Sequence, residues 1–299
     1  MSNVQKVEFG YYPWPIDLQV GAISIGTLPD FDDAVAALKV SENVDGRWIY
    51  APQCSGRIAG RVFGLRKTHT LQHDASAGDE HLAFLIWGLS FFVGMRLTAT
   101  EAGFLDATPI TPATLVDFVV INGGFEQIVL SVEYFWNANM EVPQRCLWWS
   151  AAVHALFLGQ NPKLLQFEQF LMLYAALDAC FALAKSINPI SKRIDHNERV
   201  AWMCQLFDMK TPGWARSELP SRSELSILRN EVIHEALYLK EPLGFAVQAS
   251  NSTQNLNLEL KALVCRFLVA LIGSEQSTYV RSPIDTRQIF GLELTGKFI

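Results

Sequence analysis

The sequence lacks the glycine-rich and nucleophile motifs of several large enzyme classes. It contains no GxGxxG, no GxxxxGK followed by Ser or Thr, and no GxSxG. These patterns bind dinucleotides, cradle nucleotide phosphates and expose a nucleophilic serine, respectively. Their absence removes the main sequence support for a dehydrogenase, a kinase or an α/β-hydrolase.

The most hydrophobic run of the chain is too short to cross a bilayer. Residues 82–95 contain 14 positions without a charge, whereas a membrane-spanning helix needs about 20. The first residues show no basic-then-apolar pattern of a secretion signal. We therefore expect a buried core helix at 82–95, no membrane partner and a cytoplasmic location.

Cysteine is scarce, and its number is odd. The five cysteines are far apart in the sequence, and several lie in apolar helical contexts: Cys54, Cys146, Cys180, Cys204 and Cys265. A disulfide framework would need an even set at close spacing in a small secreted chain. The pattern predicts buried thiols in a reducing compartment.

The chain also lacks an excess of basic residues. Its 24 Lys and Arg against 30 Asp and Glu give a net charge of −6, which argues against a broad basic face that coats duplex nucleic acid. One segment is locally basic, because residues 185–229 hold eight Lys or Arg and five Asp or Glu. Any nucleic-acid contact should therefore be local, and solvated helix faces explain the same charges about equally well.

Half of the residues are hydrophobic, enough for a sizeable core. Alternating runs separated by turn residues predict strands at 20–28, 47–52 and 61–65, with a helix at 32–40. After Ser76, which with Asp79 resembles a helix-capping box, the pattern is mostly helical. A further helix is predicted to start at 110–118. The later predicted helices cover residues 123–140, 143–159, 163–186, 196–209, 224–237 and 256–273.

This pattern predicts an α+β fold: a small β-containing region followed by a mostly helical chain. We expect an N-terminal α+β domain at 1–155, a helical bundle at 160–275 and a C-terminal tail at 276–299. The sequence assigns no role to the first of these domains.

One polar cluster is rich in potential metal ligands. It contains His69, His73, Asp74, Asp79, Glu80 and His81. His69 and His73 have the i to i+4 spacing that chelates zinc on a helix, but no cysteine joins them and no HExxH pattern is present. We interpret the cluster as a polar loop with a helix cap, and we expect neither a metal nor another cofactor.

The stretch ELSILRNEVIHEAL, residues 224–237, carries the sharpest polar signal. On a helical projection, Leu225 and Leu228 lie on the core-facing stripe, whereas Asn230 and His234 share the opposite face. Arg229 lies at the edge, about 140° from His234 at 100° per residue. Taken alone, the helix favours solvent-exposed Asn230 and His234 with Arg229 in a surface ion pair.

An apolar flank beside the polar pair favours a different arrangement. Ile233 and Leu237 lie off the main stripe, and such a flank suits a helix that packs against another subunit. A site that uses both Arg229 and His234 would then draw on two copies. We expect a homodimer through residues 229–237.

The segment from about 160 to 275 resembles the HEPN domains, which are all-helical nucleotide-binding and ribonuclease modules. The resemblance lies in LRNEVIHEA at 228–236, which fits the family pattern of Arg, a polar residue, and His after four to six positions. The helix FEQFLMLYAALDACFAL also resembles the family's first long helix, with Asp178 as its acidic residue. The resemblance to HEPN domains does not extend to the N-terminal 150 residues.

The resemblance implies a metal-independent endoribonuclease of the kind found in prokaryotic toxin–antitoxin and anti-phage defence systems. Its site would be built across a homodimer, and an antitoxin or other regulatory partner would be expected. His234 would transfer protons, Arg229 would bind phosphate oxygens, and Asn230 would orient His234 or bind the ribose or phosphate. Asp178 would hold Arg229 or tune His234, although a purely structural role suits it equally. Single-stranded RNA would be cut to 2′,3′-cyclic phosphate ends.

A non-catalytic protein is the alternative. HEPN-like modules also occur as binding or scaffold domains, so the helical half would dimerise and bind a nucleotide, RNA or a partner protein. On this interpretation the N-terminal half recognises a ligand or partner. Dependence of any activity on Arg229 and His234 separates the two interpretations.

Overall fold

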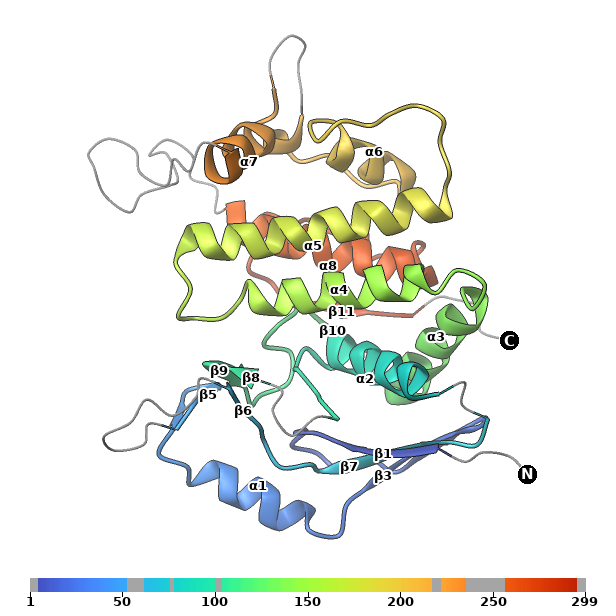
Figure 1. The fold of residues 1–299 in the computed structure, drawn as a ribbon, viewed down its shortest axis with the longest axis vertical. Helices are drawn as coiled ribbons and strands as arrows, with labels where there is room; N and C mark the ends of the chain where they lie inside the picture. Colours follow the sequence, from blue (N-terminus) through green and yellow to red (C-terminus); the bar gives the residue numbers. More distant parts are fainter. Residues whose placement is uncertain are drawn as a thin grey trace. The chain divides into compact units, whose positions relative to one another are not determined.

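The computed structural model describes residues 5–52, 62–75, 78–99, 104–216, 222–234 and 256–294. The predicted α+β class is confirmed, with small sheets in the N-terminal half and helices in the bulk of the chain (Figure 1). The chain divides into two compact units. Unit 1 comprises Met1–Cys146, Asn161–Lys163 and Ile289–Ile299, and unit 2 comprises Leu147–Gln160 and Leu164–Gln288. Residues 147–155, assigned from the sequence to the first domain, thus belong to the second unit, and the tail is divided between both.

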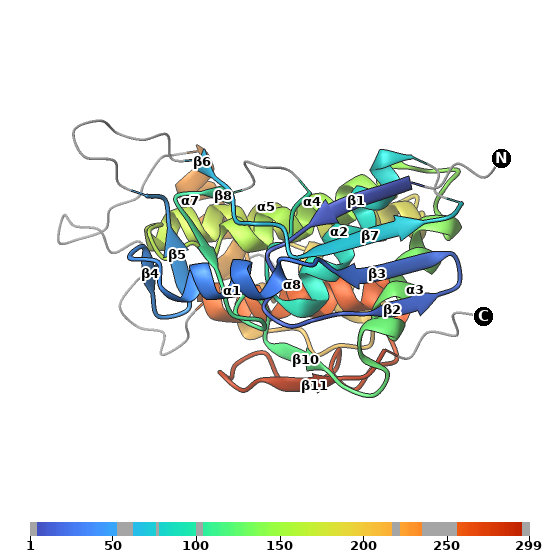
Figure 2. The ribbon, with the colours of Figure 1, turned by 90° about the horizontal axis from the view of Figure 1, so that it is seen from below.

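The largest sheet of unit 1 in the described residues is antiparallel and has four strands (Figure 2). Its strands, in spatial order, are β1 (Gln5–Phe9), β7 (His69–His73), β3 (Ile23–Thr27) and β2 (Leu18–Val20). Side chains alternate between faces along a strand. Leu71 of β7 pairs with Val7 and Ile25, and it is fully buried.

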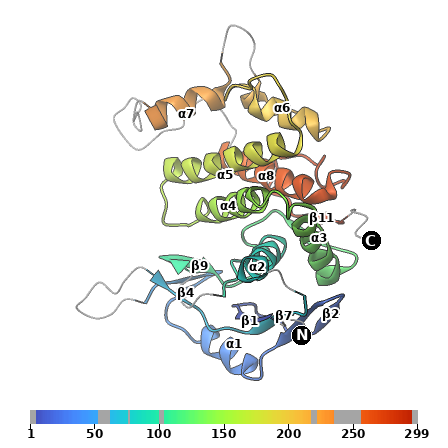
Figure 3. The same ribbon diagram turned by 45° about the vertical axis from the view of Figure 1, so that its right-hand side comes forward.

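Helices cover this sheet. Figures 1 and 3 show α2 (Asp79–Val93) on one face and α1 (Phe31–Lys39) on the opposite side. Helix α2 is apolar nearly all round, as expected for a core helix, and it packs on α3 (Gly124–Ala138). The core helix predicted at 82–95 is therefore present.

Short strands complete unit 1. Strands β4 (Val44–Asp45), β5 (Trp48–Tyr50) and β9 (Ala107–Pro109) form a three-stranded sheet. Two further pairs are β6 (Val62–Phe63) with β8 (Phe104–Leu105), and β10 (Phe118–Val120) with β11 (Phe290–Leu292). The last pair is parallel and returns the end of the chain to unit 1.

Unit 2 is helical. Its elements are α4 (Gln144–Leu158, from Leu147 onward), α5 (Gln166–Ile187), α6 (Arg199–Leu206), the 3-10 turn η1 (Gly213–Ala215), α7 (Glu224–His234), α8 (Leu256–Val269) and the π-helical turn η2 (Ala270–Ser274). Helix α5 packs along α8, while α6 and α7 lie on the side of α5 away from α4 (Figure 3). The indole of Trp149 donates to the Leu268 carbonyl at 3.2 Å, which ties α4 to α8.

Cysteines lie in the interior as predicted. Cys146, Cys180, Cys204 and Cys265 are buried, and burial raises the pKa of the Cys146 and Cys204 thiols to about 12. Such thiols stay protonated and unreactive at neutral pH. Cys54 lies outside the described residues.

Within the described ranges, α5 is the one helix long and apolar enough to cross a membrane by length and composition. Half of its most apolar window is buried inside the protein, and core helices pass the same test.

Three local predictions are wrong. The N-cap of helix α2 is Gly78, whose φ of 133° suits glycine, and the predicted cap Ser76 lies outside the described residues. Residues 110–117 form turns instead of a helix start, because backbone bonds from Ala113 and Leu115 wrap the segment around the end of α2. The supposed polar loop at 69–73 is the central strand β7.

Candidate functional site

Helix α7 carries the Arg-Asn-x-x-x-His stretch, and its start is fixed by side-chain bonds. The Ser223 backbone N–H donates to Asn197 Oδ1 at 2.6 Å, and the Ser223 hydroxyl accepts the Ser226 N–H at 3.3 Å. Leu225 and Leu228 are buried, as predicted for the core-facing stripe. The helix therefore has a defined face toward the rest of unit 2.

Arg229 lies on the inner side of α7 rather than at a solvated edge. It is half-buried beside the buried Leu228, and it donates to Asn230 Oδ1 at 3.0 Å. Its guanidinium also lies close enough to the hydroxyl of Tyr174 on α5 to lower the pKa of that hydroxyl. The His234 backbone ends α7, but its side chain lies outside the described residues.

Tyr174 joins Arg229 to an imidazole. The Tyr174 hydroxyl lies 2.9 Å from Nδ1 of His196, in the loop before α6. Burial, and then the charge of Asp178, raise the Tyr174 pKa to about 12, so the hydroxyl keeps its proton. A hydroxyl both donates and accepts, and this bond is compatible with either neutral tautomer of His196.

His196 is half-buried, and its pKa is lowered from the usual value. Burial is the first cause, and the charges of Arg199 and Arg229 add to it, while Asp178 and Asp195 oppose it. A depressed pKa keeps the imidazole neutral at pH 7, the form that accepts a proton.

Asp178 lies in this network, but with a different partner from the one expected. Its Oδ1 accepts from Arg199 on α6 at 2.6 Å, so it holds Arg199 instead of Arg229. The Arg199 guanidinium also stacks 4.6 Å from the ring centre of Phe181. The ion pair and the aromatic ring together fix the orientation of this guanidinium.

The structure thus brings together Arg229, Asn230 and Asp178 with three residues that the sequence did not single out: Tyr174, His196 and Arg199. We call these six residues the α5–α7 network. Tyr174 lies one helical turn from Asp178, a spacing that points to the same face of α5. No sequence signal identifies His196, because its proximity depends on the loop after α5.

Chemically, the network combines two guanidinium groups, one carboxylate, a phenol, an imidazole and an amide. Guanidinium groups match phosphate oxygens in geometry and charge, and a neutral imidazole transfers protons at neutral pH. Two pockets of unit 2, about 310 and 460 Å³, are lined by residues outside this network. The network joins side chains of α5, the loop before α6, α6 and α7.

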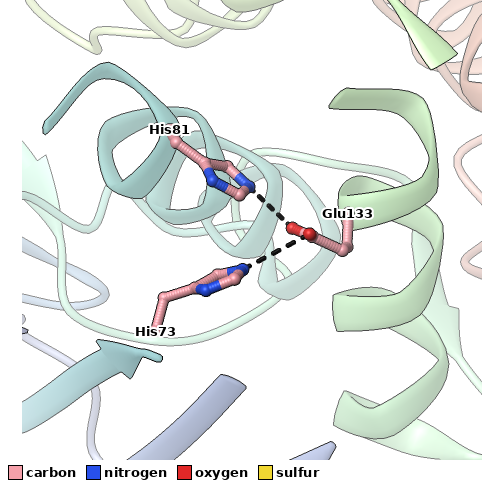
Figure 4. A group of neighbouring side chains, drawn as sticks. All are labelled: His73, His81 and Glu133. Atoms are coloured by element: carbon pink, nitrogen blue, oxygen red, sulfur yellow. Dashed lines mark hydrogen bonds and ion pairs between the residues drawn. The ribbon is translucent and has the colours of Figure 1, made fainter. Parts of the chain in front are cut away.

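A second polar group lies in unit 1. His73 at the end of β7, His81 in the first turn of α2 and Glu133 of α3 direct their side chains toward one another (Figure 4). Glu133 accepts from His81 Nε2 at 2.7 Å and from His73 Nε2 at 3.3 Å. Burial tends to raise the Glu133 pKa, but the bonds from His81, Asn137 and His73 bring it below its usual value.

The other members of the predicted polar cluster lie elsewhere. His69 is buried among aromatic rings, with Nε2 3.1 Å from the Trp14 carbonyl and Nδ1 2.9 Å from the Thr68 hydroxyl. The i to i+4 pair His69 and His73 is therefore separated along a strand, not joined on a helix. Glu133 was missed because it follows His81 by 52 positions.

Comparison with protein-family models, with curated protein sequences and with solved structures finds no match to this chain. The likeness to HEPN domains accordingly rests on the motif at 228–236 and on the helix that carries Asp178.

Proposed function

We propose that the protein is a metal-independent endoribonuclease whose site is the α5–α7 network together with His234. The observation that supports this most is the placement of Arg229. Its charge acts on the Tyr174 hydroxyl and on the half-buried His196 imidazole, as the charge of Arg199 also does, within one unit. A purely structural surface ion pair, the other interpretation of Arg229, would not require such surroundings.

Arg229 and Arg199 would bind the scissile phosphate. The reaction develops negative charge on the phosphate oxygens, and donors fixed before the reaction stabilise that charge best. Arg199 is already oriented by Asp178 at 2.6 Å and by the Phe181 ring. Asn230 bonds Arg229 at 3.0 Å, so its role in the proposal is to position that guanidinium.

Two proton transfers are needed. The RNA 2′-hydroxyl must lose a proton as its oxygen attacks phosphorus, and the 5′-oxygen must gain one as the P–O bond breaks. We assign these steps to His196, held by Tyr174 at 2.9 Å, and to His234. Because Arg229 and His234 are about 140° apart on one helix, His234 comes from a second copy of the chain.

The substrate class follows from this chemistry. Attack by a 2′-hydroxyl requires RNA and leaves a 2′,3′-cyclic phosphate and a 5′-hydroxyl. The net charge of −6 disfavours a long duplex footprint, so the proposed substrate is single-stranded RNA. A cytoplasmic toxin or anti-phage effector with a regulatory partner is the biological role that fits.

The test is cleavage of labelled single-stranded RNA in excess EDTA by wild type and by Arg229→Ala, His234→Ala and His196→Gln. Loss of one proton-transfer group is expected to slow cleavage about 10²–10⁴-fold. A matched all-DNA strand should remain intact. Product ends should be 2′,3′-cyclic phosphates.

His154→Gln is the matched control, since His154 lies on α4 within the same unit. Its cleavage rate should equal that of wild type. Equal rates for all variants would instead identify a contaminating nuclease. No cleavage, with RNA still bound, would favour the non-catalytic sensor or scaffold.

A further inference from the structure

The group of His73, His81 and Glu133 is built from three separate elements. Both imidazoles are buried, at 3% and 2% exposure, and both present Nε2 to the same carboxylate (Figure 4). The Glu133 side chain keeps 22% exposure, which leaves an open side. In the absence of an ion, the Glu133 carboxylate is the hydrogen-bond partner of both buried imidazoles.

Ligand spacing fits a tetrahedral metal ion. The three ligand atoms all lie within 4.8 Å of one another. Zinc bonds of about 2.0–2.1 Å at tetrahedral angles separate neighbouring ligand atoms by roughly 3.3 Å. The His73 Nε2 to Glu133 Oε1 distance is 3.3 Å. His81 Nε2 lies 2.7 Å from the other oxygen, Oε2, so a small side-chain shift is needed to bring both nitrogens to this spacing from one oxygen.

The surrounding contacts resemble those that support metal ligands. The Asn137 amide donates to Glu133 Oε1 at 3.0 Å. The Trp136 ring stacks on the His81 ring, with the ring centres 4.7 Å apart and an angle of 7° between the ring planes. Such outer contacts orient ligands before the ion binds. They hold the carboxylate and one imidazole in position independently of His73.

We infer that His73, His81 and Glu133 bind one Zn²⁺ ion, with the fourth position open on the exposed side of Glu133. Two histidines, one carboxylate and an open position form the ligand set of hydrolytic zinc centres. Unit 1 would thereby hold a metal site separate from the proposed ribonuclease site in unit 2. This inference departs from the sequence-based expectation of no metal, and it does not depend on the proposed function.

Binding has a local consequence at Ala75. In the structure the Ala75 N–H donates to His73 Nδ1 at 3.0 Å, so neutral His73 carries its proton on Nε2, toward Glu133. A zinc-bound Nε2 has no proton. On binding, the proton moves from Nε2 to Nδ1 and the Ala75 N–H must turn away from the ring.

The test uses untagged full-length protein, stripped with a chelator, and titrated with Zn²⁺ by calorimetry and with Co²⁺ by visible absorption. We expect one equivalent of metal and the intense absorption of tetrahedral Co²⁺. His81→Gln and Glu133→Gln should each weaken binding by far more than tenfold, and Asn137→Ala by about 10–100-fold. His154→Gln, which removes an imidazole elsewhere, should bind as wild type does.

Nitrogen NMR of wild-type histidines provides a readout that needs no variant. Added Zn²⁺ should shift Nε2 of two histidines, leave both of these rings with their proton on Nδ1 and move the Ala75 amide signal. Absence of binding, equal affinity in the Gln variants, or unchanged His73 and His81 signals would overturn the site. In that case the three side chains form a hydrogen-bonded ion pair only.

Discussion

Arg266 on α8 is a fully buried cation. Its guanidinium N–H groups donate hydrogen bonds to main-chain carbonyl and side-chain hydroxyl oxygens. It donates to the carbonyls of Ala262, Ser282 and Pro283 at 2.7–3.1 Å, and it lies 4.5 Å from the ring centre of Tyr279. A planar fork of donors makes this possible, and an ammonium group cannot reproduce it. Arg266 therefore ties the segment after η2 to α8.

We expect Arg266→Lys to lower the free energy of unfolding by about 2–4 kcal/mol, because several buried carbonyls lose their donors. Urea denaturation measures this change. Arg281→Lys is the control, since Arg281 is 44% exposed in an ion pair with Asp208, and its effect should stay within about 0.5 kcal/mol. Equal effects of the two substitutions would contradict the assigned role.

His69 is a buried histidine that stays neutral. Burial lowers its pKa to about 4, although the bond to the Trp14 carbonyl and the charge of Asp17 oppose the shift. Its folded pKa lies below the unfolded value of about 6.5. As pH falls from 6.5 to 4, the unfolded state binds a proton that the native state does not, so stability decreases across this window.

The size of this effect is roughly 3 kcal/mol between the two pH values. We expect His69→Gln to be less stable than wild type at pH 7 but to lose less stability on acidification. Denaturant unfolding at several pH values gives both slopes. If the two proteins show the same slope between pH 6.5 and 4, His69 does not titrate as the structure implies.

At the scale of elements, α2 and α3 approach closely at one glycine. A Cβ added to Gly88 would lie 2.4 Å from Cγ2 and 2.6 Å from Cγ1 of Val132. Alanine raises helix propensity by about 1 kcal/mol over glycine, but overpacking costs about 1–3 kcal/mol. The second effect prevails, since the contact involves a stiff β-branched side chain close to its backbone.

Gly88→Ala should therefore destabilise the protein in thermal unfolding, against the trend of helix propensity. Val132→Ala in the same chain should recover part of the loss, with a coupling above about 0.5 kcal/mol. Gly213→Ala is the matched control, because nothing lies within 4 Å of its added Cβ. Simple additivity of Gly88→Ala and Val132→Ala would refute the close contact.

At the scale of the whole molecule, the proposed site needs two copies of the chain. If Arg229 and His196 of one protomer act with His234 of the other, hybrids of Arg229→Ala with His234→Ala contain one intact composite site. Equal co-expression should then restore about a quarter of wild-type ribonuclease activity, since half of the dimers are hybrids. Neither variant alone should show this activity.

Size measurement by light scattering completes this test. A monomeric protein, or a dimer whose hybrids stay inactive, would place the reacting groups within one chain. That outcome would exclude the site shared between two copies. It would leave a site within one chain, with His196 as the imidazole nearest to Arg229.

Much of the fold was predictable, because hydrophobic periodicity decides which segments are helices. The helices predicted at 123–140, 143–159 and 163–186 correspond to α3, α4 and α5. The strand β7 was not predictable, since its His-Thr-Leu-Gln-His sequence is polar and its burial comes from pairing with β1 and β3. The turn segment 110–117 was mistaken for a helix because its Thr-Pro start signal is local, while its backbone partners lie on α2.

The sequence by itself determined the α+β order of elements, the buried thiols and the inner stripe of α7 at Leu225 and Leu228, all of which depend on local periodicity and hydrophobicity. Only the tertiary structure decided the partners of the polar residues. Asp178 binds Arg199, Arg229 meets Tyr174, and Glu133 joins His73 and His81. Such pairings depend on how helices and strands from distant parts of the chain pack, because a short-range polar interaction carries no periodic signal.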